Sequence, residues 1–70
     1  MKVVVYDVCC RVSDVKNGDI EIERRDVVAP DMSLEDAKKY MFLWALHNWP
    51  NSYIHVDIIH IDKKYEIGWV

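Results

Sequence analysis

The stretch SLEDAKKYMFLWALHNW, residues 33–49, most constrains how this 70-residue chain can fold. Ser33 and Asp36 stand at the spacing of a capping box, in which the hydroxyl accepts a hydrogen bond from the amide three residues on. Acidic side chains in the first turn also suit the helix dipole. Pro50 disfavours helical geometry in the residue before it and cannot continue the hydrogen-bond ladder. The sequence therefore predicts a helix that begins at Leu34 and ends near Asn48.

One face of this helix carries apolar residues at the spacing of a buried stripe. The predicted stripe is Leu34, Ala37, Met41, Trp44, Ala45 and Asn48. The run YMFLWAL, residues 40–46, is nevertheless apolar almost all round, so Phe42, Leu43 and Leu46 need a second neighbour or stay in contact with water. A contiguous apolar patch that contains an aromatic ring is typical of a contact surface.

A chain of this length forms one domain and buries only about 60% of its unfolded surface, so a partner or oligomerisation would help to stabilise it. We expect no secretory signal, because Asp7 interrupts the apolar run that follows Lys2. The adjacent Cys9 and Cys10 point to opposite faces of a strand, which makes a disulfide between them strained. Reduced cysteines favour the cytoplasm.

Alternating β-branched residues predict a strand over residues 2–12 and a second over 19–28, and Asn17-Gly18 between them indicates a hairpin. A two-residue turn would set acidic side chains beside the apolar face of the first strand. A three-residue loop, residues 16–18, sets Val12 opposite Ile22 instead. We favour the three-residue loop.

Residues 53–62 and 65–70 predict a third and a fourth strand around a turn at 62–64. The predicted fold is therefore α+β, a four-stranded antiparallel sheet in the order 2-1-3-4 (ββαββ) with the helix on one face. The helix-side layer is expected to contain Val4, Tyr6, Val8, Cys10, Val12, Ile20, Ile22, Ile54, Val56 and Ile58. The other face is expected to carry Val3, Val5, Val27, Ile59 and Ile61 beside Asp7, His55 and Asp57.

The residues that could carry chemistry do not form a recognised motif. Cys9, His55 and Asp57 share a predicted face, but no ligand spacing such as C-x-x-C or H-x-x-x-H occurs. A cysteine nucleophile with His47 or His60 has no local motif behind it either. We expect no catalytic residue, no metal and no cofactor, and an enzyme is the least favoured class.

Charge and apolar surface point instead to protein binding. The net charge is −3 and the basic residues are scattered, so the basic footprint of a nucleic-acid-binding protein is missing. Acidic residues gather between 14 and 36, where they could dock on a basic groove or simply form a solvated hairpin tip. The apolar candidates could bind a partner or complete the core. The candidate protein-binding residues are Glu21, Glu23, Asp26, Phe42, Leu46, Trp49, His55, Asp57, Ile59 and Ile61.

The order of elements resembles a group of small phage-encoded inhibitors. The residues that carry this likeness are a leading hairpin, a capped helix entered through Ala29 and Ser33–Ala37, and an extended V-x-I-I-x-I strand. Some anti-CRISPR proteins and the short phage inhibitor of bacterial RNA polymerase belong to this group. The resemblance implies a protein that performs no chemistry and blocks a host protein or nucleoprotein complex, although the fourth strand and the aromatic-rich helix depart from the polymerase-inhibitor pattern.

The leading hypothesis is therefore a cytoplasmic, non-enzymatic modulator that binds a host complex and does not contact nucleic acid or membrane directly. The first alternative is an obligate homo-oligomer, such as a homodimer, that buries the second apolar face of its helix against its own copy. The second alternative is a minor metal- or ligand-binding module. Oligomeric state and metal content separate the three.

Overall fold

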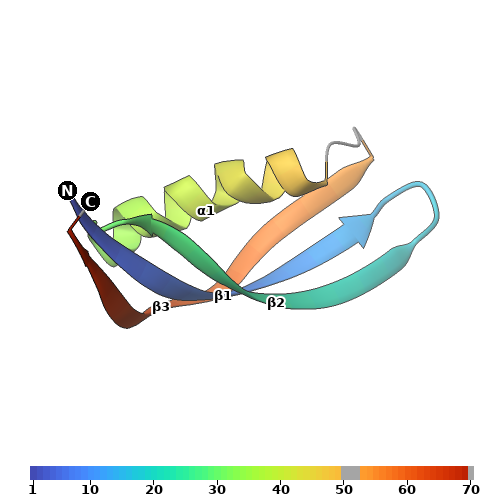
Figure 1. Cartoon of the computed structure of the whole chain (residues 1–70). Helices are drawn as coiled ribbons and strands as arrows, with labels where there is room; N and C mark the ends of the chain where they lie inside the picture. Colours follow the sequence, from blue (N-terminus) through green and yellow to red (C-terminus); the bar gives the residue numbers. More distant parts are fainter. Residues whose placement is uncertain (50–52, 70) are drawn as a thin grey trace.

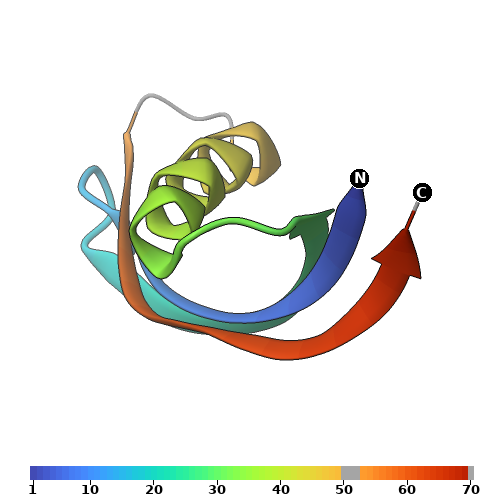
Figure 2. The ribbon, with the colours of Figure 1, turned by 90° about the vertical axis from the view of Figure 1, so that its left-hand side faces the viewer.

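The computed structural model describes residues 1–49 and 53–69. Three strands and a helix follow one another as β1 (Lys2–Asp14), β2 (Asp19–Pro30), α1 (Leu34–Asn48) and β3 (Ile54–Trp69). The strands form an antiparallel sheet in the order β2-β1-β3, and α1 lies across one face of it (Figure 1). Figure 2 shows that the sheet curves around the helix. The fold is α+β.

The prediction of four strands was wrong, because residues 54–69 form one continuous strand. The predicted turn at 62–64 contains no residue with positive φ, and Gly68 is the glycine of this segment that has one, at 129°. β1 is long enough to pair with all of β3, and shifts in register absorb the mismatch. The extra residues at these shifts are Ile59, Lys64 and Ile67, each a bulge in an edge strand.

The helix has the predicted bounds, and its cap is confirmed in part. The Ser33 hydroxyl accepts a hydrogen bond from the Asp36 amide at 3.2 Å. Ala37, Met41 and Ala45 are buried and Trp44 is partly buried, as the stripe predicts. The ends of the predicted stripe are wrong, because Leu34 is 45% exposed and Asn48 is exposed.

The predicted register of the hairpin was wrong by one residue. The pair Asp14↔Asp19 closes a four-residue loop, and Val12 therefore lies opposite Glu21. The Asp14 carboxylate accepts the amides of Lys16 and Asn17 at 3.0 and 3.2 Å, which stabilises the longer loop as an Asx turn does. Gly18 completes it with φ of 77°.

This register exchanges the two faces of β2. Val27 lies opposite Tyr6 in the core and is 7% exposed, although the sequence predicted it on the other face. Ile20 and Ile22, predicted in the core, are 65% and 59% exposed on the face away from α1. The acidic Glu21 lies opposite Val12, on the helix side of the hairpin. The tip of this hairpin extends beyond the end of α1 (Figure 1).

The core lies between α1 and the even-numbered residues of β1, as predicted. One cluster surrounds Tyr6 and Met41 and another surrounds Cys10 and Ala45. On β3, Val56 is buried and Ile54 and Ile58 are partly buried on the helix side. The first cluster contains Val4, Tyr6, Val8, Val27, Ala29, Ala37 and Met41, and the second contains Cys10, Val12, Ala45 and Val56.

Candidate functional site

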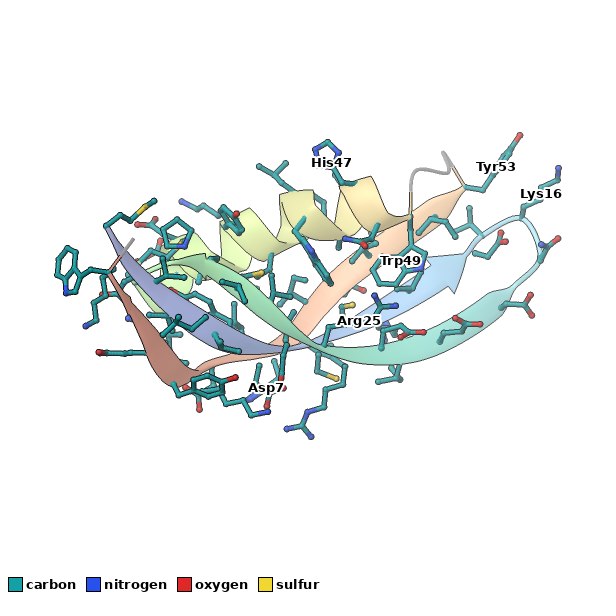
Figure 3. All side chains as sticks on the ribbon, in the orientation of Figure 1. Asp7, Lys16, Arg25, His47, Trp49 and Tyr53 are labelled. Atoms are coloured by element: carbon teal, nitrogen blue, oxygen red, sulfur yellow. The ribbon has the colours of Figure 1, made fainter. Side chains whose placement is uncertain are left out.

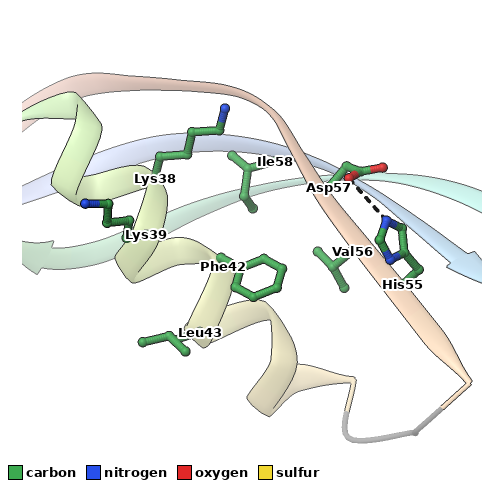
Figure 4. A pocket seen from close by; sticks show the side chains of 8 residues that line it. All are labelled: Lys38, Lys39, Phe42, Leu43, His55, Val56, Asp57 and Ile58. Carbon is green, nitrogen blue, oxygen red and sulfur yellow. Dashed lines mark ion pairs between the residues drawn. The ribbon is translucent and has the colours of Figure 1, made fainter.

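A groove opens between α1 and β3, with a volume of about 560 Å³ (Figure 4). We call it the α1–β3 groove. Phe42 and Leu43 form its apolar wall on the helix, and they are 42% and 60% exposed. Val56 and Ile58 lie across from them on β3 (Figure 4). The lining residues are Lys38, Lys39, Phe42, Leu43, His55, Val56, Asp57 and Ile58.

The two lysines at this groove differ from the other basic residues of the chain. Of the nine Lys and Arg side chains, seven form an ion pair or lie over an aromatic ring: Lys2, Arg11, Lys16, Arg24, Arg25, Lys63 and Lys64. Within residues 1–49 and 53–69, neither Lys38 nor Lys39 has an acidic side chain within ion-pair distance. Glu35 precedes them by one turn and makes no such contact. The groove therefore combines apolar surface with uncompensated positive charge.

The rim on β3 is held by a charge network. Arg11 donates to the Asp57 carboxylate at 2.7 Å, and His55 Nε2 lies 3.4 Å from the other carboxylate oxygen (Figure 4). The Arg11 hydrogen bond and then the charges of His55 and Arg11 hold the pKa of Asp57 below its ordinary value. The carboxylate is therefore ionised at neutral pH. His55 is exposed and Asp57 partly exposed, as an accessible rim requires.

The acidic residues of the hairpin do not act as one charged surface. Glu23 lies 3.6 Å from Arg25, and Asp26 accepts a hydrogen bond from Lys64 at 2.9 Å on the opposite face of the sheet. Glu21 makes no ion pair among the described residues. It lines a smaller hollow of about 150 Å³ with Val12, Asp14, Asp19, Trp49 and Ile54.

The remaining candidate residues are divided between surface and core. Trp49 packs edge-on against Trp44, with ring centroids 6.2 Å apart, and the Arg25 guanidinium lies 5.5 Å from its ring centroid (Figure 3). Leu46 is 40% exposed on α1. The two isoleucines were both predicted on the outer face, but they are separated by the bulge: Ile59 is 53% exposed, whereas Ile61 packs on the core.

The sequence analysis did not place Lys38 and Lys39 at this groove, because both lie outside the predicted buried stripe. A signal was present in their spacing. Lys38 precedes Phe42 by four residues and Lys39 precedes Leu43 by four residues, so each lysine shares a helix face with an exposed apolar side chain. The groove joins Phe42, His55 and Asp57 of the predicted set, and it leaves the acidic hairpin apart.

The cysteines lie in different environments. Burial raises the pKa of the Cys10 thiol, which disfavours the reactive thiolate. Cys9 lies opposite His60 in the ladder, but no hydrogen bond joins them in the described part of the chain. Both cysteines are free. Residues 1–49 and 53–69 also contain no group of three or more His, Cys, Asp or Glu side chains arranged to hold a metal ion.

Neither known protein families nor curated proteins nor solved structures provide a match to this chain. The resemblance to phage inhibitors thus stays a prediction from the order of elements. In the described residues, no helix has both the length and the apolar character needed to cross a bilayer.

Proposed function

We propose that this protein acts by binding another protein through the α1–β3 groove and performs no chemistry of its own. The observation that carries the proposal is the coincidence, in one groove, of exposed apolar side chains with Lys38 and Lys39 in a chain of net charge −3. Aromatic side chains such as Phe42 are enriched where binding energy concentrates. A phage-encoded inhibitor of a host complex is one protein that would work in this way.

The groove selects the chemistry of the partner. Phe42, Leu43 and Ile58 offer apolar contacts, and the two ammonium groups favour a partner that carries carboxylates beside its apolar side chains. Lys38 and Lys39 would steer such a partner and fix its register more than they would add affinity. The acidic hairpin is the weaker candidate, because Arg25 and Lys64 already pair with Glu23 and Asp26.

The test is affinity capture with the wild-type chain and two charge-reversal variants. Lys38→Glu/Lys39→Glu reverses the groove, and Lys63→Glu/Lys64→Glu changes the net charge equally elsewhere. The control turns the Lys63–Asp31 and Lys64–Asp26 ion pairs into pairs of carboxylates. Both sites are reached by solvent, so the cost in stability is small. We expect a protein retained by the wild type and the control from a lysate of the source cells, and lost by the groove variant. If the groove variant retains the same proteins as the wild type, the proposal is wrong.

A further inference from the structure

The inference concerns the open edge of β3, next to the α1–β3 groove. In the described chain β3 pairs with β1 and with no other strand. The Val15 amide donates to the Tyr53 carbonyl at 3.0 Å. Backbone groups alternate in direction along an antiparallel strand, so those of Ile54, Val56 and Ile58 face away from β1. Such groups form a template for pairing with a further strand.

Only part of this edge is regular. The bulges at Ile59, Lys64 and Ile67 interrupt the pairing direction along the second half of β3, and bulges in edge strands oppose association. From Ile54 to Ile58 the register with β1 is continuous. Residues 60–63 are also in register, but this run is shorter and lies between two bulges. The five-residue segment Ile-His-Val-Asp-Ile is therefore the part of the edge best suited to pairing.

We propose that residues 54–58 pair antiparallel with the same segment of a second copy, about a twofold axis at Val56. Residues opposite one another then share a face, as in any antiparallel ladder. Val56 faces its own copy and Ile54 faces Ile58 on the helix side. On the outer face, His55 lies opposite Asp57 of the second copy. The segment thus pairs apolar side chains with apolar ones on one face and a histidine with a carboxylate on the other.

Neighbouring axes lack this complementarity. An axis at His55 or at Asp57 sets that side chain opposite itself, and the axis at Asp57 places two carboxylates together.

The edge of β2 is regular over its whole length, but any axis from residue 22 to residue 26 brings like charges together. An axis at Ile22 sets Glu21 opposite Glu23, and each axis from Glu23 to Asp26 sets a charged side chain opposite itself. Like charges directly opposite one another destabilise strand pairing.

Pairing at this edge would join the two sheets into one and bring the two grooves together across the axis. The floor would then consist of Val56 and Ile58 from both copies, with a helix on either side. Phe42 and Leu43, which are exposed in the single chain, would face this common floor. The binding site is thus incomplete in one copy, an inference that goes beyond the proposed function.

The test removes one outward-facing amide. The chain is short enough for chemical synthesis, and N-methylation of Val56 deletes the donor and keeps the side chain. N-methylation of Ile22, whose amide faces away from β1 at the other edge, is the matched control. Sedimentation equilibrium at micromolar concentration should give twice the 8.3 kDa chain mass for the wild type and for the control, and the single mass for N-methyl Val56. A monomeric wild type, or a dimeric N-methyl Val56 chain, overturns the proposal.

A second pair of variants decides the question if N-methylation unfolds the chain, which far-ultraviolet circular dichroism would reveal. His55→Asp sets a carboxylate opposite Asp57 of the second copy on each side of the axis, whereas His60→Asp adds the same charge outside the paired segment. We expect His55→Asp to raise the dimer dissociation constant roughly tenfold and His60→Asp to leave it near the wild-type value. Equal dissociation constants for the two variants overturn the pairing. These masses are independent of partner capture, so the dimer and the proposed function fail separately.

Discussion

The two outer strands of the sheet pair with the same central strand but protect their open edges by different means. β2 keeps one register over its whole length and carries charged side chains along its first half. β3 changes register at Ile59, Lys64 and Ile67, and its longest uninterrupted run is residues 54–58. Charge therefore protects the straight edge and bulges protect the irregular one. The unprotected segment of β3 borders the groove.

The bulges also decide which side chains of β3 reach the core. Without the extra residue at Ile59, side chains would alternate strictly and Ile61 would lie on the outer face. With it, Ile58 and Ile61 both pack on the core cluster around Met41. Irregularity in β3 thus lets one strand follow the curved sheet and still bury apolar side chains on the helix side.

The largest expected effect comes from the helix residue whose core cluster is joined by side chains of both outer strands. Met41 is fully buried in a cluster that includes Val27 of β2 and is packed against by Ile58 and Ile61 of β3. Met41→Ala should lower the free energy of unfolding by about 2–5 kcal/mol, a large share of the stability of a small domain. Urea unfolding at fixed protein concentration measures it. A loss as small as that of an exposed substitution would contradict a shared core.

The next largest effect comes from comparing one chemical change, the loss of a tyrosine hydroxyl, at a contact with β2 and on β3. The buried Tyr6 hydroxyl donates to the Pro30 carbonyl and accepts from the Met32 amide, both at 3.1 Å, and so fixes the end of β2. Tyr6→Phe should lower the free energy of unfolding by about 1–3 kcal/mol, because it leaves two partly buried backbone groups without this partner. Tyr65→Phe on β3, where the ring is 56% exposed, is the control and should change little. If urea unfolding gave equal losses of unfolding free energy for Tyr6→Phe and Tyr65→Phe, the expected difference between the two sites would be refuted.

The ion pairs that tie each outer strand to β1 predict a smaller, pH-dependent effect. Two hydrogen bonds from Arg24 of β2, at 2.9 and 2.6 Å, lower the pKa of Asp7. A hydrogen bond from Arg11 lowers the pKa of Asp57 on β3. A carboxylate whose pKa is lower in the folded state stabilises the fold above its unfolded pKa, and this contribution is lost as the pH falls through the folded pKa. Stability should therefore decline below about pH 4.

The Asp7 side chain is 15% exposed and that of Asp57 is 38% exposed, so solvent screens the Asp57 carboxylate more strongly. Asp7→Asn should reduce the acid dependence of unfolding more than Asp57→Asn does. Chemical unfolding between pH 7 and pH 2 compares the two variants, and a larger change for Asp57→Asn would reverse the expected order.

Sequence reasoning succeeded where a local pattern alone determines the structure. The alternation from Val4 to Val12 selects one face of β1. The Ser33 cap and the proline that follows the helical run set the bounds of α1. It failed where a distant contact decides between local alternatives. No local feature of residues 62–64 indicates that the residues after them continue the same strand and pair with β1. The sequence analysis named Phe42, which the structure places in the α1–β3 groove, whereas the position of Lys38 and Lys39 at this groove depends on which face of the helix meets β3.

The hairpin register gives the smallest effect and the most direct comparison between sequence and structure. The choice of a four-residue loop is fixed at the far end of β2, where Val27 must face Tyr6. Ile22→Ala should therefore change the free energy of unfolding by no more than about 0.5 kcal/mol, as exposed substitutions usually do. Val27→Ala should cost about 1–2 kcal/mol, because it removes buried methyl groups. The three-residue loop predicts the opposite order, so urea unfolding of these two variants alone distinguishes the registers.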